Sequence, residues 1–235
     1  MSKLPQDRVF VDVGADVGFM SLAIADLGYR VFAFEPIPYS QGKLCEGITW
    51  NNFSNLVTVF PFAAGSEALD NVPFYTREDG HLGSSSLHRN AIVKDRKLVR
   101  DIHDPTIDSH NASHWKKINV IPIRTAVRRL DAVIPRHEKL GILKVDAQGA
   151  DFNVLKGATG LLNRTVAEGA PYQIVFEFDL RFLVKRISDH NWREYEPFMA
   201  SMKYKCNFPS YEKLEAQEAD VATLRRSDDV SCTKV

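Results

Sequence analysis

The chain of 235 residues is long enough for one α/β domain that buries a substantial core. Its thirty basic and thirty acidic residues cancel, which argues against a protein that holds nucleic acid or an anionic membrane through its overall charge. The apolar content of 44% is ordinary for a globular protein, and no apolar run approaches the roughly 20 residues that span a bilayer.

The first residues, 1–8, are polar and carry no signal-peptide or transit pattern, so we expect a cytoplasmic location. The first apolar run begins close to Met1, which fits either a protein without an N-terminal helical cap or a chain whose N-terminus has been trimmed. Cys45, Cys206 and Cys232 are odd in number and lack the spacing of metal ligands. We therefore expect reduced thiols.

Strand and helix patterns alternate along the chain in the manner of a doubly wound parallel sheet. Apolar runs predict strands at Val9–Val13, Arg30–Phe34, Leu56–Phe62, Val72–Thr76, Val120–Ile123, Gly141–Asp146 and Tyr172–Phe178. Helices are predicted at Phe19–Leu27, Pro38–Trp50, Ala126–Ile134, Phe152–Leu162 and Trp192–Met202. Lys203–Phe208 and Val230–Val235 fit a terminal hairpin or a closing pair of strands, and we expect residues 1–235 to form a single domain.

A polar insertion interrupts this alternation at about residues 77–118. Glycine and serine predict a flexible loop at Gly80–Leu87, and Asn90–Lys117 is charged and histidine-containing without clean periodicity. A loop of this length is usually a functional lid or a disordered segment. We expect the insertion to act as a loop or lid that selects the substrate.

The first strand-turn-helix carries the clearest functional pattern in the chain. The predicted strand Val9–Val13 contains Asp12 and leads into Gly14 and Gly18, and the next predicted strand delivers Glu35. Glycines allow the backbone to approach a ligand closely, and an acid after the second strand can accept hydrogen bonds from ribose hydroxyls. The pattern therefore predicts a nucleoside site, although an ordinary βα turn with glycines for packing is the alternative.

The glycine spacing indicates which nucleoside cofactor fits. It is Gly-x-x-x-Gly, whereas dinucleotide folds use Gly-x-Gly-x-x-Gly, in which the second glycine admits a diphosphate to the helix N-terminus. Here Asp16 takes that place and would repel a diphosphate. S-adenosylmethionine, which has a sulfonium, an ammonium and a ribose, suits this loop better.

A second signature lies at Lys144–Ala158, which reads Lys-Val-Asp-Ala-Gln-Gly-Ala-Asp-Phe-Asn-Val-Leu-Lys-Gly-Ala. Together with the first motif and Phe34-Glu35-Pro36, it resembles the FkbM-type family of S-adenosylmethionine-dependent methyltransferases. That family typically has Asp-Val-Gly-Ala-Asn-x-Gly, Phe-Glu-Pro and Lys-x-Asp-x-Glu-Gly-Ala-Glu. The chain departs from this pattern at Asp16 for Asn, Gln148 for Glu and Asp151 for the second Glu, and Gln148 removes a carboxylate beside the presumed reaction centre.

The resemblance implies the class I methyltransferase fold, a Rossmann-like, doubly wound sheet of seven mostly parallel strands with a C-terminal antiparallel strand pair. It implies S-adenosylmethionine as cofactor, with S-adenosylhomocysteine as product. The cofactor-binding residues that it implies are Asp12, Gly14, Ala15, Asp16, Gly18, Glu35, Pro36, Ala63, Ala64 and Asp146. Asp12, Gly14 and Asp16 are expected at the methionine end, Glu35 at the ribose, and Ala63 with Ala64 at the adenine.

Four residues are candidates for catalysis: Asp146, Lys144, Glu177 and His88. Asp146 ends the strand that faces the methyl group in this fold and could be the base or orient the acceptor; a cap of the following helix, or a contact to the cofactor ammonium, is the structural alternative. Lys144 lies on the same strand face and could neutralise Asp146, and His88 could be a base because histidine ordinarily has a pKa near 6.5. His103, Asp108, His110 and His114 match no metal-site spacing, so no metal is expected.

The leading hypothesis is O-methylation of a hydroxyl on a sugar or polyketide-like small molecule, a substrate class that comes from the resemblance alone. A nucleic-acid methyltransferase is disfavoured, because Asp146-Ala-Gln-Gly149 stands where base-amino methylases carry Asn- or Asp-Pro-Pro-Tyr/Phe. Gln148 motivates a third possibility, a cofactor-binding module with weakened or lost catalysis. Asp16 argues against a nicotinamide-dependent dehydrogenase.

Overall fold

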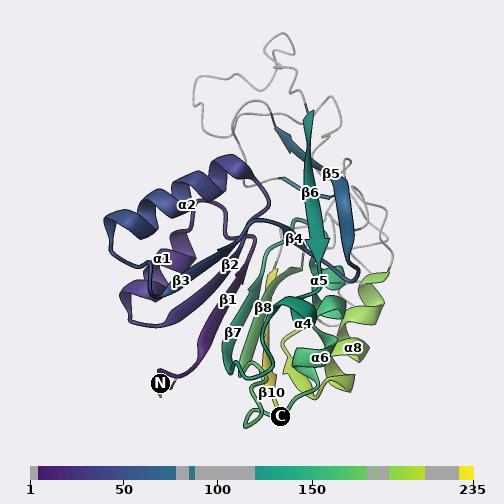
Figure 1. Cartoon of the computed structure of the whole chain (residues 1–235). Helices are drawn as coiled ribbons and strands as arrows, with labels where there is room; N and C mark the ends of the chain where they lie inside the picture. The colour runs from purple at the N-terminus through teal and green to yellow at the C-terminus, as the bar shows by residue number, and fades with distance from the viewer. Residues whose placement is uncertain (1–4, 78–84, 88–119, 179–182, 184–190, 210–227) are drawn as a thin grey trace, which may run out of the picture.

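The computed structural model describes residues 5–77, 85–87, 120–178, 183, 191–209 and 228–235, and its main element is a sheet of seven strands (Figure 1). The strands run in the order β3 (Val57–Phe60), β2 (Arg30–Phe34), β1 (Val9–Val13), β7 (Leu140–Val145), β8 (Gln173–Phe178), β10 (Asp228–Lys234) and β9 (Tyr204–Cys206). The first five are parallel, and β10 is antiparallel to both of its neighbours. This topology confirms the expected seven-stranded, mostly parallel sheet with a C-terminal antiparallel pair.

Helices cover both faces of this sheet. On one side lie α1 (Phe19–Asp26) and α2 (Pro38–Trp50), and on the other lie α4 (Leu130–Val133), α5 (Asp151–Gly157), α6 (Thr159–Leu162) and α8 (Tyr195–Ser201), which follows the 3₁₀ turn η3 (Asn191–Glu194) (Figure 1). Strand β1 is buried along its whole length because alternate side chains enter different cores. Phe10 packs in the cluster of α1 and α2, whereas Val11 and Val13 pack in the larger cluster of α5, α6 and α8. Burial on both faces explains why this strand is a continuous apolar run.

A second, three-stranded sheet was not expected from the sequence. It consists of β4 (Ala63–Ala64), β6 (Val120–Arg128) and β5 (Leu69–Arg77), with β6 in the centre, parallel to β4 and antiparallel to β5. The predicted helix over Ala126–Ile134 is therefore wrong at its start: Val127 pairs with Ala63 and Leu69, and only Leu130–Val133 is helical. Long-range strand pairing overrides local helical periodicity here.

Two other predicted helices are divided. The segment Phe152–Leu162 forms α5 and α6, which meet at Ala158, and Trp192–Met202 forms η3 followed by α8. Of the predicted insertion at residues 77–118, only Arg77 and Ser85–Leu87 are among the described residues. Its role as a lid therefore stays a prediction.

The expectation of reduced thiols is wrong for two of the three cysteines. Cys206 on β9 and Cys232 on β10 are directly opposite each other in the antiparallel ladder and form a disulfide, while Cys45 is free and exposed. Because disulfides persist mainly in oxidising compartments, this bond does not support the expected cytoplasmic location, which stays a prediction. In the described part of the chain, no helix has the length and apolarity to cross a membrane.

Candidate functional site

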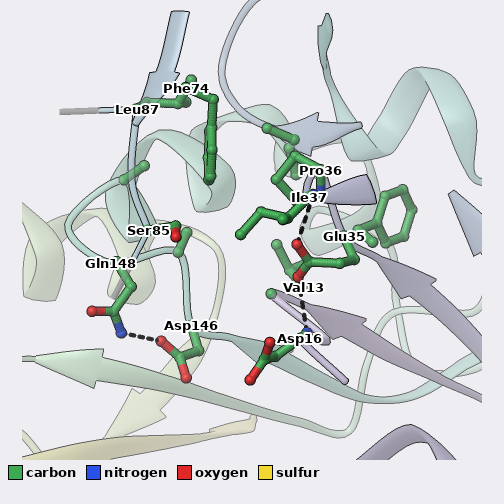
Figure 2. Close-up of a pocket in the computed structure, with 16 residues that line it drawn as sticks. Val13, Asp16, Glu35, Pro36, Ile37, Phe74, Ser85, Leu87, Asp146 and Gln148 are labelled. Atoms are coloured by element: carbon green, nitrogen blue, oxygen red, sulfur yellow. Dashed lines mark hydrogen bonds between the residues drawn. The ribbon is translucent and has the colours of Figure 1, made fainter. Parts of the chain in front are cut away.

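A cavity lies beyond the carboxyl ends of β1, β2 and β7, next to β4 and β5 (Figure 2). Parallel strands place the residues that follow them at one edge of the sheet, which is where open α/β sheets bind ligands. Seven residues predicted to bind the cofactor line this cavity: Gly14, Asp16, Glu35, Pro36, Ala63, Ala64 and Asp146.

The loop between β1 and α1 requires glycine for packing. Gly14 has a φ of +74°, and a Cβ atom there would lie 2.0 Å from the backbone oxygen of Asp146. Gly18 has a φ of +93°, and a Cβ atom there would lie 2.3 Å from Cδ1 of Leu44 on α2. The glycines thus let the loop pack against the end of β7 and against α2, in addition to any approach to a ligand.

Glu35 holds two loops together at the cavity wall. Its Oε2 accepts a hydrogen bond from the backbone N–H of Asp16 at 2.8 Å, and its Oε1 accepts one from the N–H of Ile37 at 2.8 Å (Figure 2). The residue is only 4% exposed, and this burial raises the pKa of its carboxyl group to about 7, against the opposing effect of the two N–H donors. The Oγ of Ser40 donates to Asp16 Oδ1 and holds that side chain beside the cavity.

The buried pair of Asp12 and Lys144 supports the glycine loop from behind. Asp12 is fully buried; its Oδ2 accepts a hydrogen bond from Ser21 Oγ at 2.7 Å, and its Oδ1 lies 3.0 Å from Lys144 Nζ. Lys144 Nζ also donates to the backbone oxygen of Gly14 at 2.8 Å. Neither Asp12 nor Lys144 lines the cavity, and neither do Ala15 and Gly18. Direct contacts of these residues with a cofactor stay predictions.

The turn after β7 carries the second group of polar side chains. Asp146 lines the cavity, and its Oδ1 accepts a hydrogen bond from Gln148 Nε2 at 2.7 Å (Figure 2). The same amide nitrogen donates to Glu177 Oε2 at 3.2 Å, which places Glu177 next to Asp146 although it does not line the cavity. Asp151, at the start of α5, accepts hydrogen bonds from the N–H groups of Ala147 and Gly149 and so fixes the turn.

Two buried carboxyl groups make the stability of the fold dependent on pH. Burial raises the pKa of Asp151 to about 7, as it does for Glu35, so the folded protein holds protons on both that the unfolded chain has already lost. We expect the free energy of unfolding to decrease as the pH rises from about 4 to about 7, and to level off above that. Urea denaturation at several pH values would measure this. Glu35→Gln and Asp151→Asn should each flatten the dependence, and an unchanged profile in both variants would contradict it.

The lining has an acidic part and an apolar part. Asp16, Glu35 and Asp146 face the cavity at one end, and the side chains of Phe74 and Leu87 lie at the other (Figure 2). No lysine, arginine or histidine is among the described residues that line it. Such a cavity attracts a ligand with a cationic centre and repels a diphosphate.

Several lining residues were not singled out in the sequence. Ile37, Phe74 and Ala150 are apolar and carry no motif, and Phe74 reaches the cavity because β5 belongs to the second sheet. Ser85 and Leu87 also line it, and both belong to the loop Gly80–Leu87 that the sequence marks as flexible. Apolar residues of a cavity wall carry no chemically distinctive pattern in the sequence, so they cannot be told from core residues there.

The remaining candidates lie outside the described residues. These are His88 and the possible metal ligands His103, Asp108, His110 and His114. Within the part of the chain that the structure describes, no three His, Cys, Asp or Glu side chains are grouped so that they could hold a metal ion. The expectation of a site without a metal stays a prediction.

Comparison with known proteins shows the family. The sequence profile described as "Methyltransferase FkbM domain" matches residues 12–206. The chain is 30% identical over 173 residues to the AMB antimetabolite synthetase AmbE of Pseudomonas aeruginosa, an alignment that covers 66% of this chain and 8% of that protein. The chain therefore corresponds to only a small part of that synthetase.

Among solved structures, the fold resembles the methyltransferase FkbM from Methylobacillus flagellatus KT. The TM-score is 0.53 at 16% sequence identity, and the alignment covers 99% of this chain and 45% of that chain. At this identity the similarity shows the fold alone. The profile match covers both motifs and most of the sheet, and the chain therefore belongs to the FkbM family of methyltransferases and has the class I methyltransferase fold.

Proposed function

We propose that this protein transfers a methyl group from S-adenosylmethionine to a hydroxyl of a small molecule, with a sugar or a polyketide-like compound as the acceptor class. The observation that carries the proposal is the composition of the cavity wall. Asp16, Glu35 and Asp146 give it three carboxyl groups, and its described lining has no basic side chain. A sulfonium and an ammonium suit such a wall, whereas the diphosphate of a dinucleotide does not.

The residues present fit this cofactor. Each oxygen of Glu35 accepts one backbone N–H and keeps a second lone pair that a ribose hydroxyl can use. Ala63 and Ala64 are small, buried wall residues and suit the flat adenine ring. Asp16 would face the methionine end, and Lys144 would hold the Gly14 loop in place from behind.

The cofactor supplies an activated methyl group, and the protein supplies alignment and the handling of one proton. Asp146 would orient the acceptor hydroxyl and take its proton, and Glu177, joined to it through Gln148, would support that role. Alignment of reacting groups can contribute on the order of 7–11 kcal/mol in favourable intramolecular reactions. A positioned base typically adds about 10²–10⁴-fold.

The acceptor would enter from the side of Ser85 and Leu87. Both line the cavity and belong to the segment at about 77–118 that we propose as the substrate-selecting lid of a single domain. The similarity to part of an antimetabolite synthetase supports a small-molecule acceptor over a macromolecule. Gln148 in place of a carboxylate keeps a second candidate open, a cofactor-binding module with weakened catalysis.

Replacement of Glu35 by alanine tests the cofactor assignment. Above pH 7, where the Glu35 carboxyl group is mostly ionised, we expect S-adenosylmethionine binding to weaken by about 1.5–3 kcal/mol, because the variant loses a charged acceptor of ribose hydrogen bonds. Isothermal titration calorimetry with S-adenosylmethionine, S-adenosylhomocysteine and NAD measures this. Glu46→Ala, which removes an exposed carboxylate of α2, is the matched control and should bind normally. Unchanged affinity in Glu35→Ala would move the ribose elsewhere, and binding of NAD alone would overturn the proposed cofactor.

A panel of glycosides and polyketides, mixed with protein and methyl-labelled S-adenosylmethionine, tests the reaction. Transfer of label to a hydroxyl supports the proposed function. Tight cofactor binding without transfer to any acceptor favours the binding module, and label in nucleic acid or protein favours a macromolecular substrate.

A further inference from the structure

Gln148 has a backbone conformation that is unusual for a residue other than glycine. Its φ is +48°, in the left-handed region that non-glycine residues rarely adopt, and Gly149 follows with a φ of +91°. Its backbone oxygen accepts a hydrogen bond from Ser86 Oγ at 2.8 Å. Strained backbone of this kind persists where the surrounding contacts demand it, and it is concentrated at functional sites.

The side chain of Gln148 contacts two carboxylates. The amide nitrogen of Gln148 donates to Asp146 Oδ1 at 2.7 Å and to Glu177 Oε2 at 3.2 Å. Both partners are carboxylates, which accept hydrogen bonds when ionised, so the nitrogen and not the oxygen of the amide must face them. Gln148 thereby joins the residues that end two neighbouring parallel strands, β7 and β8.

Two further carboxyl groups belong to elements next to this pair. Asp229 on β10 is directly opposite Glu177 in the antiparallel ladder, and the buried Asp151 lies at the start of the next helix. Lys144 Nζ is 3.9 Å from Asp146 Oδ2 and makes closer contacts with Asp12 and Gly14. Asp146 and Glu177 carry like charges that repel each other, and an amide nitrogen that donates to both reduces this repulsion.

We propose that Gln148 is a positioning residue for methyl transfer: its two N–H donors hold Asp146 and Glu177 together, as a divalent cation would in a site made of carboxylates alone. The inference rests on the proposed function, because it assigns the pair to the acceptor side of the cavity. Asp146 lines the cavity, its side chain is 42% exposed, and its Oδ1 is fixed by Gln148, which leaves Oδ2 to meet an acceptor hydroxyl. Transfer then needs no added divalent cation.

Gln148→Glu tests this arrangement without any acceptor. The variant places a third carboxylate between Asp146 and Glu177, and carboxylates are the ligands that Mn²⁺ prefers. We expect Mn²⁺, followed by water proton relaxation, to bind the variant about tenfold or more tightly than the native protein. Adding Glu177→Gln to the variant should abolish the gain, and Gln6→Glu, which adds the same charge at an exposed site, should show none. Equal Mn²⁺ affinity in the native protein and Gln148→Glu would overturn the proposal.

Gln148→Gly tests the role in the reaction. Glycine accepts the left-handed backbone, so the variant removes the side chain without adding strain. With the acceptor that the labelled panel identifies, we expect kcat to fall about 10–100-fold while the dissociation constant of S-adenosylmethionine stays within about twofold. If Gln148 only stabilised the fold around the cavity, its loss would change both kcat and the dissociation constant of S-adenosylmethionine. EDTA should leave the native rate unchanged, and Mn²⁺ should restore part of the rate of Gln148→Glu.

Different results would contradict the proposed function and the role of Gln148. If the native protein does not bind S-adenosylmethionine, the proposed function fails, and the Mn²⁺ titration still decides whether Gln148 bridges the carboxylates. If the native protein transfers methyl groups and Gln148→Gly does so at the same kcat, or if EDTA abolishes the native rate, the role of Gln148 is wrong and the proposed function stands.

Discussion

Lys144→Met is expected to lower the free energy of unfolding by about 3–5 kcal/mol, because it leaves the carboxylate of Asp12 buried without its cation. Asp12 is fully buried and has Ser21 as its other side-chain partner. The variant also removes the hydrogen bond from Lys144 to the backbone oxygen of Gly14. Urea denaturation followed by circular dichroism measures the change, and calorimetry should show weaker cofactor binding because the glycine loop loses its support.

Lys43→Met is the matched control for this experiment. Lys43 forms an ion pair with Glu46 at 2.8 Å on the exposed surface of α2, so its loss should leave the free energy of unfolding nearly unchanged. The double variant Asp12→Asn, Lys144→Met removes both charges and should recover part of the stability. Equal losses of unfolding free energy in Lys144→Met and Lys43→Met would show that burial does not increase the contribution of the Asp12–Lys144 ion pair to stability.

Gly14→Ala should be comparably damaging, at about 4 kcal/mol of unfolding free energy. The new Cβ atom would lie 2.0 Å from the backbone oxygen of Asp146, so either the β1–α1 loop or the end of β7 has to move. The left-handed φ of +74° adds about 1–2 kcal/mol for a non-glycine residue, and forced overpacking costs about 1–3 kcal/mol. Because the loop and Asp146 both line the cavity, binding of S-adenosylmethionine should be lost as well.

Gly42→Ala controls for the effect of replacing a glycine. Gly42 lies in α2, and a Cβ atom there would meet nothing within 4 Å. Alanine favours helix over glycine by about 0.5–1 kcal/mol, so this variant should be slightly more stable than the native protein and bind the cofactor normally. Native stability and binding in Gly14→Ala would show that the loop accommodates a side chain.

The sequence predicted the main sheet and the glycine-containing loop between β1 and α1 well. Val9–Val13 and Arg30–Phe34 are strands with the predicted bounds, and Pro38–Trp50 is the predicted helix. These elements are readable because burial on both sides of a parallel strand leaves an uninterrupted apolar run, and helix periodicity follows one buried face. The glycines and acids were visible because few residue types satisfy a left-handed turn or accept hydrogen bonds from a sugar.

The tertiary structure decided the features that depend on residues far apart in the sequence, namely the end of β6 and the disulfide. Ala126–Arg128 has helical periodicity and yet forms the end of β6, because β4 and β5 offer it backbone hydrogen bonds that the sequence nearby does not reveal. The disulfide of Cys206 and Cys232 follows from the pairing of β9 with β10, which spacing along the chain does not give.

The same division applies to the site. The sequence by itself determined that Asp12, Lys144, Glu35 and Gln148 stand at the ends of strands, where the chemistry of this fold is placed. Only the tertiary structure separated their positions: Asp12 and Lys144 form a buried pair behind the loop, Glu35 faces the cavity, and Gln148 joins two carboxylates. A residue type specifies what a group can donate, accept or carry as charge, whereas packing of neighbouring strands and loops decides which groups it meets and how much water remains around it.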